Sequence, residues 1–197
     1  MLCCVLMCAL VRVVQSAKPD DSFLREVEKK IVDEFECHGH EVEVIDLSNL
    51  SIAPCKGCFG CWVHSPGRCV IDDDGAKLTG WYLHADAVVL LSRICFGGYC
   101  STMKRCMDRL IPMVLPFFRN FQGETHHKMR YESYPMLLSV GVLDEDDSEQ
   151  AELFQHLVFR NALNFCPKKT AIAVLQQKSS NWHQQLSGPL KNIGGEL

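Results

Sequence analysis

Four cysteines in one short segment carry the strongest chemical signal in the sequence. Two residues separate Cys55 from Cys58 and Cys58 from Cys61, and Cys69 follows after seven more. Four thiolates at this spacing can converge on one iron-sulfur cluster, and they also suit a closed tetrahedral zinc site. A third interpretation is a loop of packed or redox-labile thiols without any metal. The spacing therefore predicts a capacity to bind a metal or cluster and leaves the occupant open.

The segment from Gln15 to Ser22 could bind an anion, because it leads directly into a helical pattern. The first N–H groups of a helix are unpaired and lie at its positive dipole end, so hydroxyl groups and Lys18 could help them to hold a phosphate. The alternative is a helix cap formed by Asp20, Asp21 or Ser22 without a ligand. Negative charge on the two aspartates opposes an anion, so this segment alone favours neither interpretation.

Paired glycines form a third candidate, because Gly97 and Gly98 lie in the segment Ser92–Ser101 just after an apolar run. Glycines at a strand end permit positive φ angles and let a flat ligand approach the backbone, with Phe96 or Tyr99 able to pack on a ring. An ordinary tight turn explains the same pattern.

Composition limits the classes of protein to consider. The chain has 197 residues, of which 47% are hydrophobic and 22% charged, and its formal net charge is -4. These values predict one globular domain over residues 1–197 and exclude disorder, collagen and coiled coil. The sequence pI of about 6.0 lacks the basic footprint of nucleic-acid binding, so we expect no nucleic-acid partner.

The apolar N-terminus, Met1 to Leu10, is interpreted as the leader of a buried first strand. No basic residue precedes it, no small-residue cleavage site follows it, and Arg12 interrupts it well short of the roughly 20 residues of a membrane helix. Several of the 12 cysteines lie in apolar runs, where free cysteine behaves as a small hydrophobe. We therefore expect no membrane association and a reducing, cytoplasmic compartment.

Strand-like and helical patterns alternate along the chain. Strands are expected at Ala9–Gln15, Glu41–Leu47, Ala87–Leu91, Pro135–Val142 and Thr170–Leu175. One helix is expected along the apolar stripe Phe23, Val27, Ile31 and Phe35, and it should stop at Gly39. Two more helices are expected at Ser101–Leu115 and Ser148–Phe165. Alternation of this kind predicts an α/β fold with a five-stranded parallel, doubly wound sheet between helical layers. Ligands of such sheets bind at the carboxyl ends of the strands, here the loops Gln15–Ser22, Leu47–Asp74, Ser92–Ser101 and Ser139–Asp147.

Three further segments are expected to have structural roles. His126 and His127 are interpreted as solvated residues of an irregular loop, Arg119–Ser133, which could also be a lid or a subunit contact. The run Asp72–Asp74 is interpreted as the cap of the next helix rather than as a calcium site. The tail after Gln176 has no strong pattern and is expected to be loosely held.

From about Ala9 to Leu175 the sequence resembles the flavodoxin-like NADPH-dependent FMN reductase family, and more narrowly its branch that includes the iron-sulfur flavoproteins. The residues that carry the resemblance are Pro54–Cys61 with Pro66–Asp74, and Phe96–Gly98 through Met103–Lys104 to Asp108–Arg109. The family motif Gly-Ser-x-Arg, ending in Asn-Ser/Thr, is represented by Gln15–Lys18 and Asp21–Ser22. The family's Pro-x-Tyr is represented by Arg93–Ile94–Cys95.

The resemblance implies a flavodoxin-like three-layer sandwich that binds FMN and transfers a hydride from NAD(P)H to the flavin, followed by electron delivery to an unknown acceptor. It implies no catalytic side chain, because the cofactor performs the chemistry. It places Ser16, Lys18 and Ser22 at the FMN phosphate, and at the flavin ring it places Ile94, Cys95, Phe96, Gly97, Gly98, Ser139, Val140 and Gly141. Cys55, Cys58, Cys61 and Cys69 would ligate a [4Fe-4S] cluster, and a homodimer or homotetramer is expected.

Two alternatives remain beside this flavin-dependent oxidoreductase. One is an electron carrier in which the cluster of the four cysteines is essential. The other is a non-enzymatic member of the fold with a degenerate phosphate loop and a zinc-binding or partner-binding role, suggested by Gln15 in place of glycine and by Asp20 and Asp21.

Overall fold

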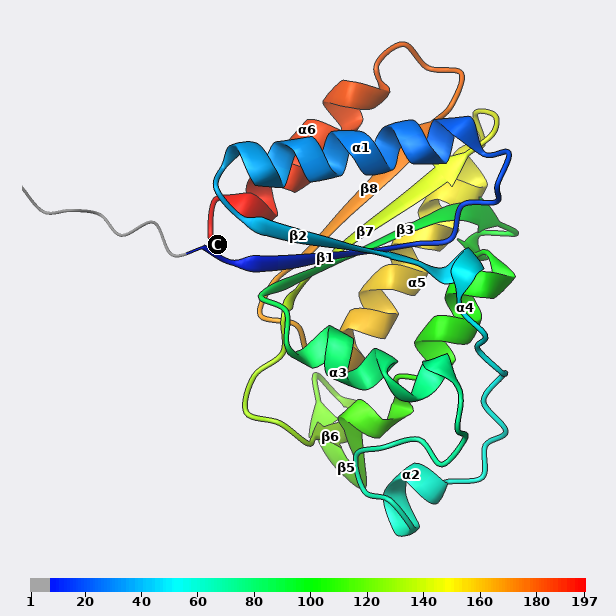
Figure 1. Ribbon diagram of the computed structural model, residues 1–197, viewed down its shortest axis with the longest axis vertical. Helices are drawn as coiled ribbons and strands as arrows, with labels where there is room; N and C mark the ends of the chain where they lie inside the picture. The colour runs from blue at the N-terminus through cyan, green and yellow to red at the C-terminus, as the bar shows by residue number, and fades with distance from the viewer. Residues whose placement is uncertain (1–7) are drawn as a thin grey trace, which may run out of the picture.

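A central sheet of five parallel strands organises the chain in the computed structural model, which describes residues 8–197 (Figure 1). The strands are β1 (Leu10–Gln15), β2 (Glu41–Asp46), β3 (Ala87–Cys95), β7 (Met136–Leu143) and β8 (Thr170–Gln176), in the order β2-β1-β3-β7-β8. The predicted α/β fold with a five-stranded parallel sheet is confirmed. The predicted leader over residues 1–7 lies outside the described residues.

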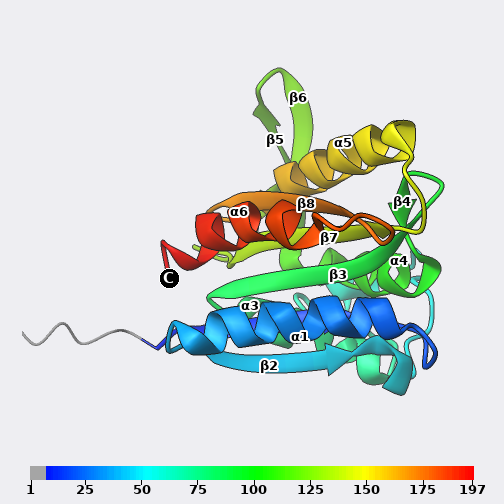
Figure 2. The same ribbon diagram turned by 90° about the horizontal axis from the view of Figure 1, so that it is seen from above.

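Helices cover both faces of this sheet and form three layers (Figures 1 and 2). The helices α1 (Ser22–Cys37) and α6 (Trp182–Gly194) pack on one face, and α3 (Leu78–Leu83), α4 (Ser101–Asp108) and α5 (Ser148–Phe165) pack on the other. The short α2 (Gly60–Val63) lies in the cysteine segment, and single 3-10 turns occur at Leu47–Asn49, Asp74–Ala76 and Ile111–Met113. No helix in residues 8–197 combines the length and the apolar character needed to cross a membrane.

The apolar patterns account for these elements. Residues 87–91 of β3 and all of β7 are buried because helices cover both faces of the sheet. Helix α1 buries Leu24, Val27, Ile31 and Phe35, so Leu24 takes the position expected for Phe23, which is only partly buried. The helix ends just before Gly39, whose φ of 86° is readily adopted only by glycine.

Two predicted boundaries around residues 92–115 were wrong. Strand β3 continues to Cys95 and pairs with the two-residue strand β4 (Gly98–Tyr99), where a loop was expected. The helix expected over Ser101–Leu115 ends at Asp108, because Pro112 lacks the N–H that would continue it.

The irregular loop expected over Arg119–Ser133 was also wrong. Strands β5 (Val114–Phe121) and β6 (Glu124–Met129) form a hairpin. Its turn residues Gln122 and Gly123 have φ values of 53° and 81°, the left-handed pair that a two-residue hairpin turn requires.

The end of the chain differs from the expected loosely held tail. Helix α6 buries Trp182, Leu186, Leu190 and Ile193 against the sheet and α1. These residues follow helical spacing, which Gly188 and Pro189 interrupt in the sequence.

Candidate functional site

A cavity of about 410 Å³ lies at the carboxyl edge of the sheet, as the parallel topology predicts. The first turns of two helices contribute hydroxyl groups to it, Ser22 from α1 and Ser101 and Thr102 from α4. Ser16 adds a further hydroxyl from the loop after β1. The charged lining residues are Lys18, Asp20, Asp21, Arg93 and Asp144.

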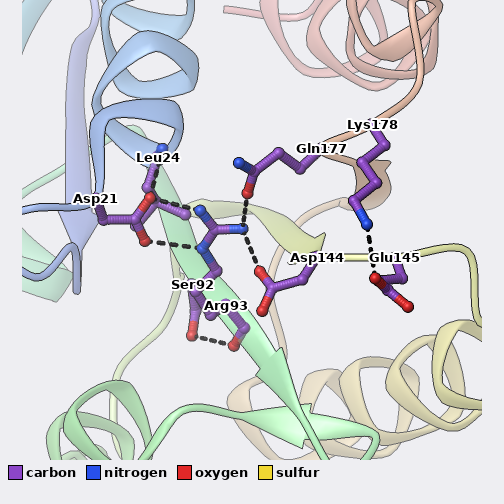
Figure 3. A network of polar contacts seen from close by, with 8 residues as sticks. All are labelled: Asp21, Leu24, Ser92, Arg93, Asp144, Glu145, Gln177 and Lys178. Atoms are coloured by element: carbon purple, nitrogen blue, oxygen red, sulfur yellow. Dashed lines mark hydrogen bonds and ion pairs between the residues drawn. The ribbon is translucent and has the colours of Figure 1, made fainter.

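Asp21 both caps α1 and binds Arg93 (Figure 3). Its Oδ1 accepts a hydrogen bond from the Leu24 N–H at 3.0 Å, and its two oxygens accept bonds from Arg93 Nε at 2.8 Å and Nη2 at 2.5 Å. Burial raises the pKa of Asp21, but the bonds from Arg93 and Leu24 outweigh burial and leave this pKa below its ordinary value. Asp21 therefore forms the helix cap that the sequence offered as one of two interpretations, and its charge is compensated by Arg93.

Five of the predicted flavin-site residues line this cavity: Ser16, Lys18, Ser22, Ile94 and Cys95. The Cys100 thiol donates to Ser16 Oγ at 3.1 Å, which connects the start of α4 to the loop after β1.

The other predicted flavin-site residues lie elsewhere. Phe96 and Gly97 form the positive-φ turn between β3 and β4, Gly98 starts β4, and the Phe96 side chain is fully exposed. Ser139, Val140 and Gly141 are interior residues of β7.

The interior position of Ser139 and Gly141 has a packing explanation. Ser139 Oγ shares a hydrogen bond of 2.9 Å with the Tyr99 hydroxyl, and a Cβ atom at Gly141 would lie 2.6 Å from the Phe154 ring and 2.7 Å from Ile94 Cδ1. These residues therefore hold β7 against β3, β4 and α5.

Arg93, Asp144 and Gln177 are cavity residues that were absent from the predicted site. Arg93 lies near the carboxyl end of β3, and Asp144 and Gln177 directly follow β7 and β8, so the rule of carboxyl ends could have suggested them. The sequence does not show that Arg93 is a site residue, because the residues that it binds lie 51–84 positions away in the chain.

A second cavity, of about 490 Å³, is lined by all four cysteines of the cysteine segment, Cys55, Cys58, Cys61 and Cys69. Cys61 is buried, Cys69 is half-buried, and the other two are exposed. Burial, together with the neighbouring thiols of the segment, raises the pKa of Cys61. The four thiols fit a metal or cluster by donor chemistry, but within residues 8–197 no three metal-ligating side chains are arranged to hold an ion.

Arg109 joins the two ends of the cysteine segment. Its buried guanidinium donates to the Ala53 carbonyl at 2.8 Å and to both oxygens of Asp73 at 2.7 and 2.8 Å. These bonds lower the pKa of Asp73 to about 2. The interpretation of Asp72–Asp74 as a helix cap was wrong, because Asp73 makes no cap bond and Asp74 accepts from the Ser51 N–H instead.

The interpretation of His126 and His127 as solvated loop residues was also wrong. His126 is 5% exposed and lies between Glu124 and Asn164. His127 donates from Nδ1 to the Leu115 carbonyl at 2.7 Å, and its ring packs on Trp62 of α2. Both histidines therefore have structural contacts in the hairpin, and His127 joins it to the cysteine segment.

Comparison with known proteins places this geometry in a family. The family model described as NADPH-dependent FMN reductase matches residues 11–173. An iron-sulfur flavoprotein of Methanocaldococcus jannaschii is 36% identical over 86 residues, which are 43% of this chain and 44% of that protein. One of Archaeoglobus fulgidus is 36% identical over 92 residues, 47% of this chain and 43% of the relative. The matched segments thus span less than half the length of these curated relatives.

Solved structures share the fold. An NAD(P)H:quinone oxidoreductase from Methanothermobacter marburgensis superposes with a TM-score of 0.67 at 14% identity, covering 95% of this chain and 94% of the other. An FMN-dependent NADH-azoreductase from Bacillus anthracis, solved in complex with FMN, gives a TM-score of 0.64 at 12% identity, covering 95% and 97%. These likenesses support a flavodoxin-like arrangement, and the family match over residues 11–173 shows that the chain belongs to the NADPH-dependent FMN reductase family.

Proposed function

We propose that this protein is a flavin-dependent NAD(P)H oxidoreductase that holds FMN in the cavity at the carboxyl edge of the sheet. The observation that carries the proposal is the composition of this cavity. It combines hydroxyl groups, two cationic side chains and the first turns of α1 and α4 at the edge where parallel sheets bind ligands. Family membership and the relatives' names point to the same cofactor.

The chain offers suitable groups for each part of FMN. Ser16, Lys18 and Ser22 would hold the phosphate, with further hydroxyls from Ser101 and Thr102. The side-chain amide nitrogen of Gln15, the last residue of β1 and next to Ser16, is buried without a partner, so the end of this strand also holds an unused donor.

The flavin ring would lie against Ile94 and Cys95, next to the turn Phe96–Gly98. When bound, FMN supplies the redox chemistry, taking a hydride from NAD(P)H and passing electrons to an acceptor. The protein's part is to orient the ring and to keep the phosphate in place. No acid or base from the chain is required.

Two further properties belong to this proposal. We place the protein in a reducing, cytoplasmic compartment, which the ten free cysteines of residues 8–197 support. We also propose a homo-oligomer, supported by the exposed aromatic side chains of the hairpin and of α5, Phe117, Phe118, Phe121 and Phe159.

The test is a visible absorption spectrum of freshly purified protein, followed by titration with FMN and measurement of NAD(P)H oxidation. We expect a flavin spectrum and oxidation that increases with bound FMN. A colourless protein that does not take up added FMN would remove the proposal and favour a non-enzymatic member of the fold.

A second candidate is an iron-sulfur flavoprotein electron carrier. It is favoured by the four cysteines that line one cavity and by the relatives that carry this name. Purification without air, followed by assays for iron, zinc and acid-labile sulfide, tests it. Stoichiometric iron and sulfide are expected for a cluster, zinc without sulfide would indicate a structural metal site, and absence of all three would leave a metal-free loop.

A further inference from the structure

Arg93 distributes its hydrogen bonds between two sides of the cavity (Figure 3). Nε and Nη2 donate to Asp21, whereas Nη1 donates to Asp144 Oδ1 and to Gln177 Oε1, both at 2.7 Å. One guanidinium thus joins the loops that follow β1, β7 and β8. Both N–H groups of Nη1 are satisfied only by side chains that line the cavity.

The two carboxylates that share Arg93 differ in how firmly they are held. The Asp21 side chain is 11% exposed and is fixed by its bond from the Leu24 N–H. The Asp144 side chain is 81% exposed, and within residues 8–197 its carboxylate accepts no bond except the one from Arg93. Asp144 can therefore turn into solvent at little cost, whereas Asp21 cannot leave without uncapping α1.

The cavity carries more negative than positive charge, so the position of Asp144 affects how well an anion can bind there. Its carboxylates, Asp20, Asp21 and Asp144, outnumber its cations, Lys18 and Arg93, by one. A phosphate monoester carries about -1.5 to -2 charges at neutral pH, so it meets repulsion while Asp144 occupies Arg93. A guanidinium that exchanges an exposed carboxylate for phosphate oxygens keeps its charge-assisted hydrogen bonds.

We propose that Arg93 is a specificity-determining residue that binds the phosphate monoester of the flavin through Nη1, and that Asp144 is a built-in competitor for the same N–H groups. This inference rests on the proposed function. Phosphate binding displaces Asp144 into solvent, while Asp21 keeps its bonds to Nε and Nη2. The preference for FMN over riboflavin, which lacks the phosphate, is then set by the exchange at Arg93.

The chain provides a matched control in Glu145. This residue follows Asp144 directly, carries the same charge, is 75% exposed and pairs with Lys178 Nζ at 2.6 Å instead of with Arg93. Figure 3 shows the two pairs side by side. Asp144→Asn and Glu145→Gln each remove one negative charge near the cavity, but only Asp144→Asn weakens the acceptor that competes for Arg93 Nη1, because it replaces a carboxylate with a neutral amide.

The experiment titrates the flavin-free full chain with FMN and with riboflavin, in wild type and both variants, by quenching of flavin fluorescence. We expect Asp144→Asn to bind FMN about threefold to tenfold more tightly, and both variants to bind riboflavin within about twofold of wild type. Glu145→Gln should change FMN affinity by less than about twofold, because its charge is exposed and screened. Arg93→Gln should weaken FMN about tenfold to hundredfold, the value of a charge-assisted hydrogen bond.

Three outcomes would overturn the inference. Equal effects of Asp144→Asn and Glu145→Gln on FMN affinity would show that Asp144 acts only through its negative charge and does not compete for Arg93. A lower KM for NADPH relative to NADH in Asp144→Asn, with FMN affinity unchanged, would assign Arg93 to the nicotinamide ligand instead. Wild-type protein that binds neither flavin would remove the proposed function together with this inference, whereas the first two outcomes leave the proposed function intact.

Discussion

Arg109 and Asp73 form the most fully buried ion pair among the described residues. The Arg109 side chain is 0% exposed and that of Asp73 is 12% exposed. Gly75 leaves the space for this guanidinium, because a Cβ atom there would lie 2.6 Å from Arg109 Cζ. Removal of one partner from such a pair leaves a buried charge without compensation, which is far more costly than loss of a surface pair.

We predict that Asp73→Asn lowers the free energy of unfolding by about 2–4 kcal/mol at neutral pH. Because the pKa of Asp73 is lowered from 3.8 to about 2 in the folded state, its stabilisation is present above pH 3.8 and is lost as the pH falls toward about 2. The difference from wild type should therefore narrow as the pH falls through this range. Urea unfolding at a series of pH values measures it.

Asp72→Asn is the control, since this exposed neighbour makes no ion pair within residues 8–197. It should change stability by less than about 0.5 kcal/mol. Equal losses in the two variants, or a difference for Asp73→Asn that does not change with pH, would contradict the assigned role of the pair.

At the scale of single residues, local signals predicted part of the candidate site. Ser16, Lys18 and Ser22 could be named because a loop between a strand and a helix fixes where they lie. Arg93 and Asp144 could not be named as a pair, because 51 residues separate them and only the parallel order of β3 and β7 brings them together.

At the scale of elements, Gly141 has a packing role between a strand and a helix, whether or not the flavin ring also lies near it. The glycine lies in β7 between the Phe154 ring of α5 and Ile94 of β3. A side chain at this position has no free space, so glycine is required for the layers to approach. The sequence identifies a glycine near a strand end, but it does not distinguish a ligand from a helix as the neighbour.

We predict that Gly141→Ala destabilises the protein by about 1–3 kcal/mol through overpacking. Gly80→Ala is the matched control, because the nearest atom to its Cβ would be His84 Nδ1 at 3.9 Å and the position is inside α3. Alanine should there be neutral or stabilising by up to about 1 kcal/mol. Thermal unfolding measures the stability of both variants. A Gly141→Ala protein as stable as the Gly80→Ala protein would disprove the packing role of Gly141.

Elements with regular apolar spacing were predicted well, and those with interrupted spacing were not. Helix α5 has the bounds expected from its pattern, Ser148–Phe165. Helix α6 was missed because Gly188 and Pro189 break its pattern, although its buried residues make it part of the core. The β5–β6 hairpin was missed because its turn is Gln122–Gly123 rather than the stronger Asn-Gly or Asp-Gly signal.

At the scale of the whole molecule, the two cavities are separate and share no lining residue. The cavity at the sheet edge lies beside the first turn of α1, whereas the cysteine cavity lies beside α2 and the hairpin. Figure 1 shows α2 and the hairpin toward the opposite end of the long axis from α1. Flavin binding and metal binding can therefore fail independently. The proposed FMN site is the first of these two cavities.

A crystal structure of the full chain with FMN is the sharpest test of this site. We expect the flavin phosphate at the carboxyl edge of the sheet, within hydrogen-bond distance of Ser16, Ser22 and Arg93 Nη1, with Asp144 turned away. FMN bound in the cysteine cavity, or its phosphate pointing into solvent while Asp144 still pairs with Arg93, would show that the proposed site is wrong.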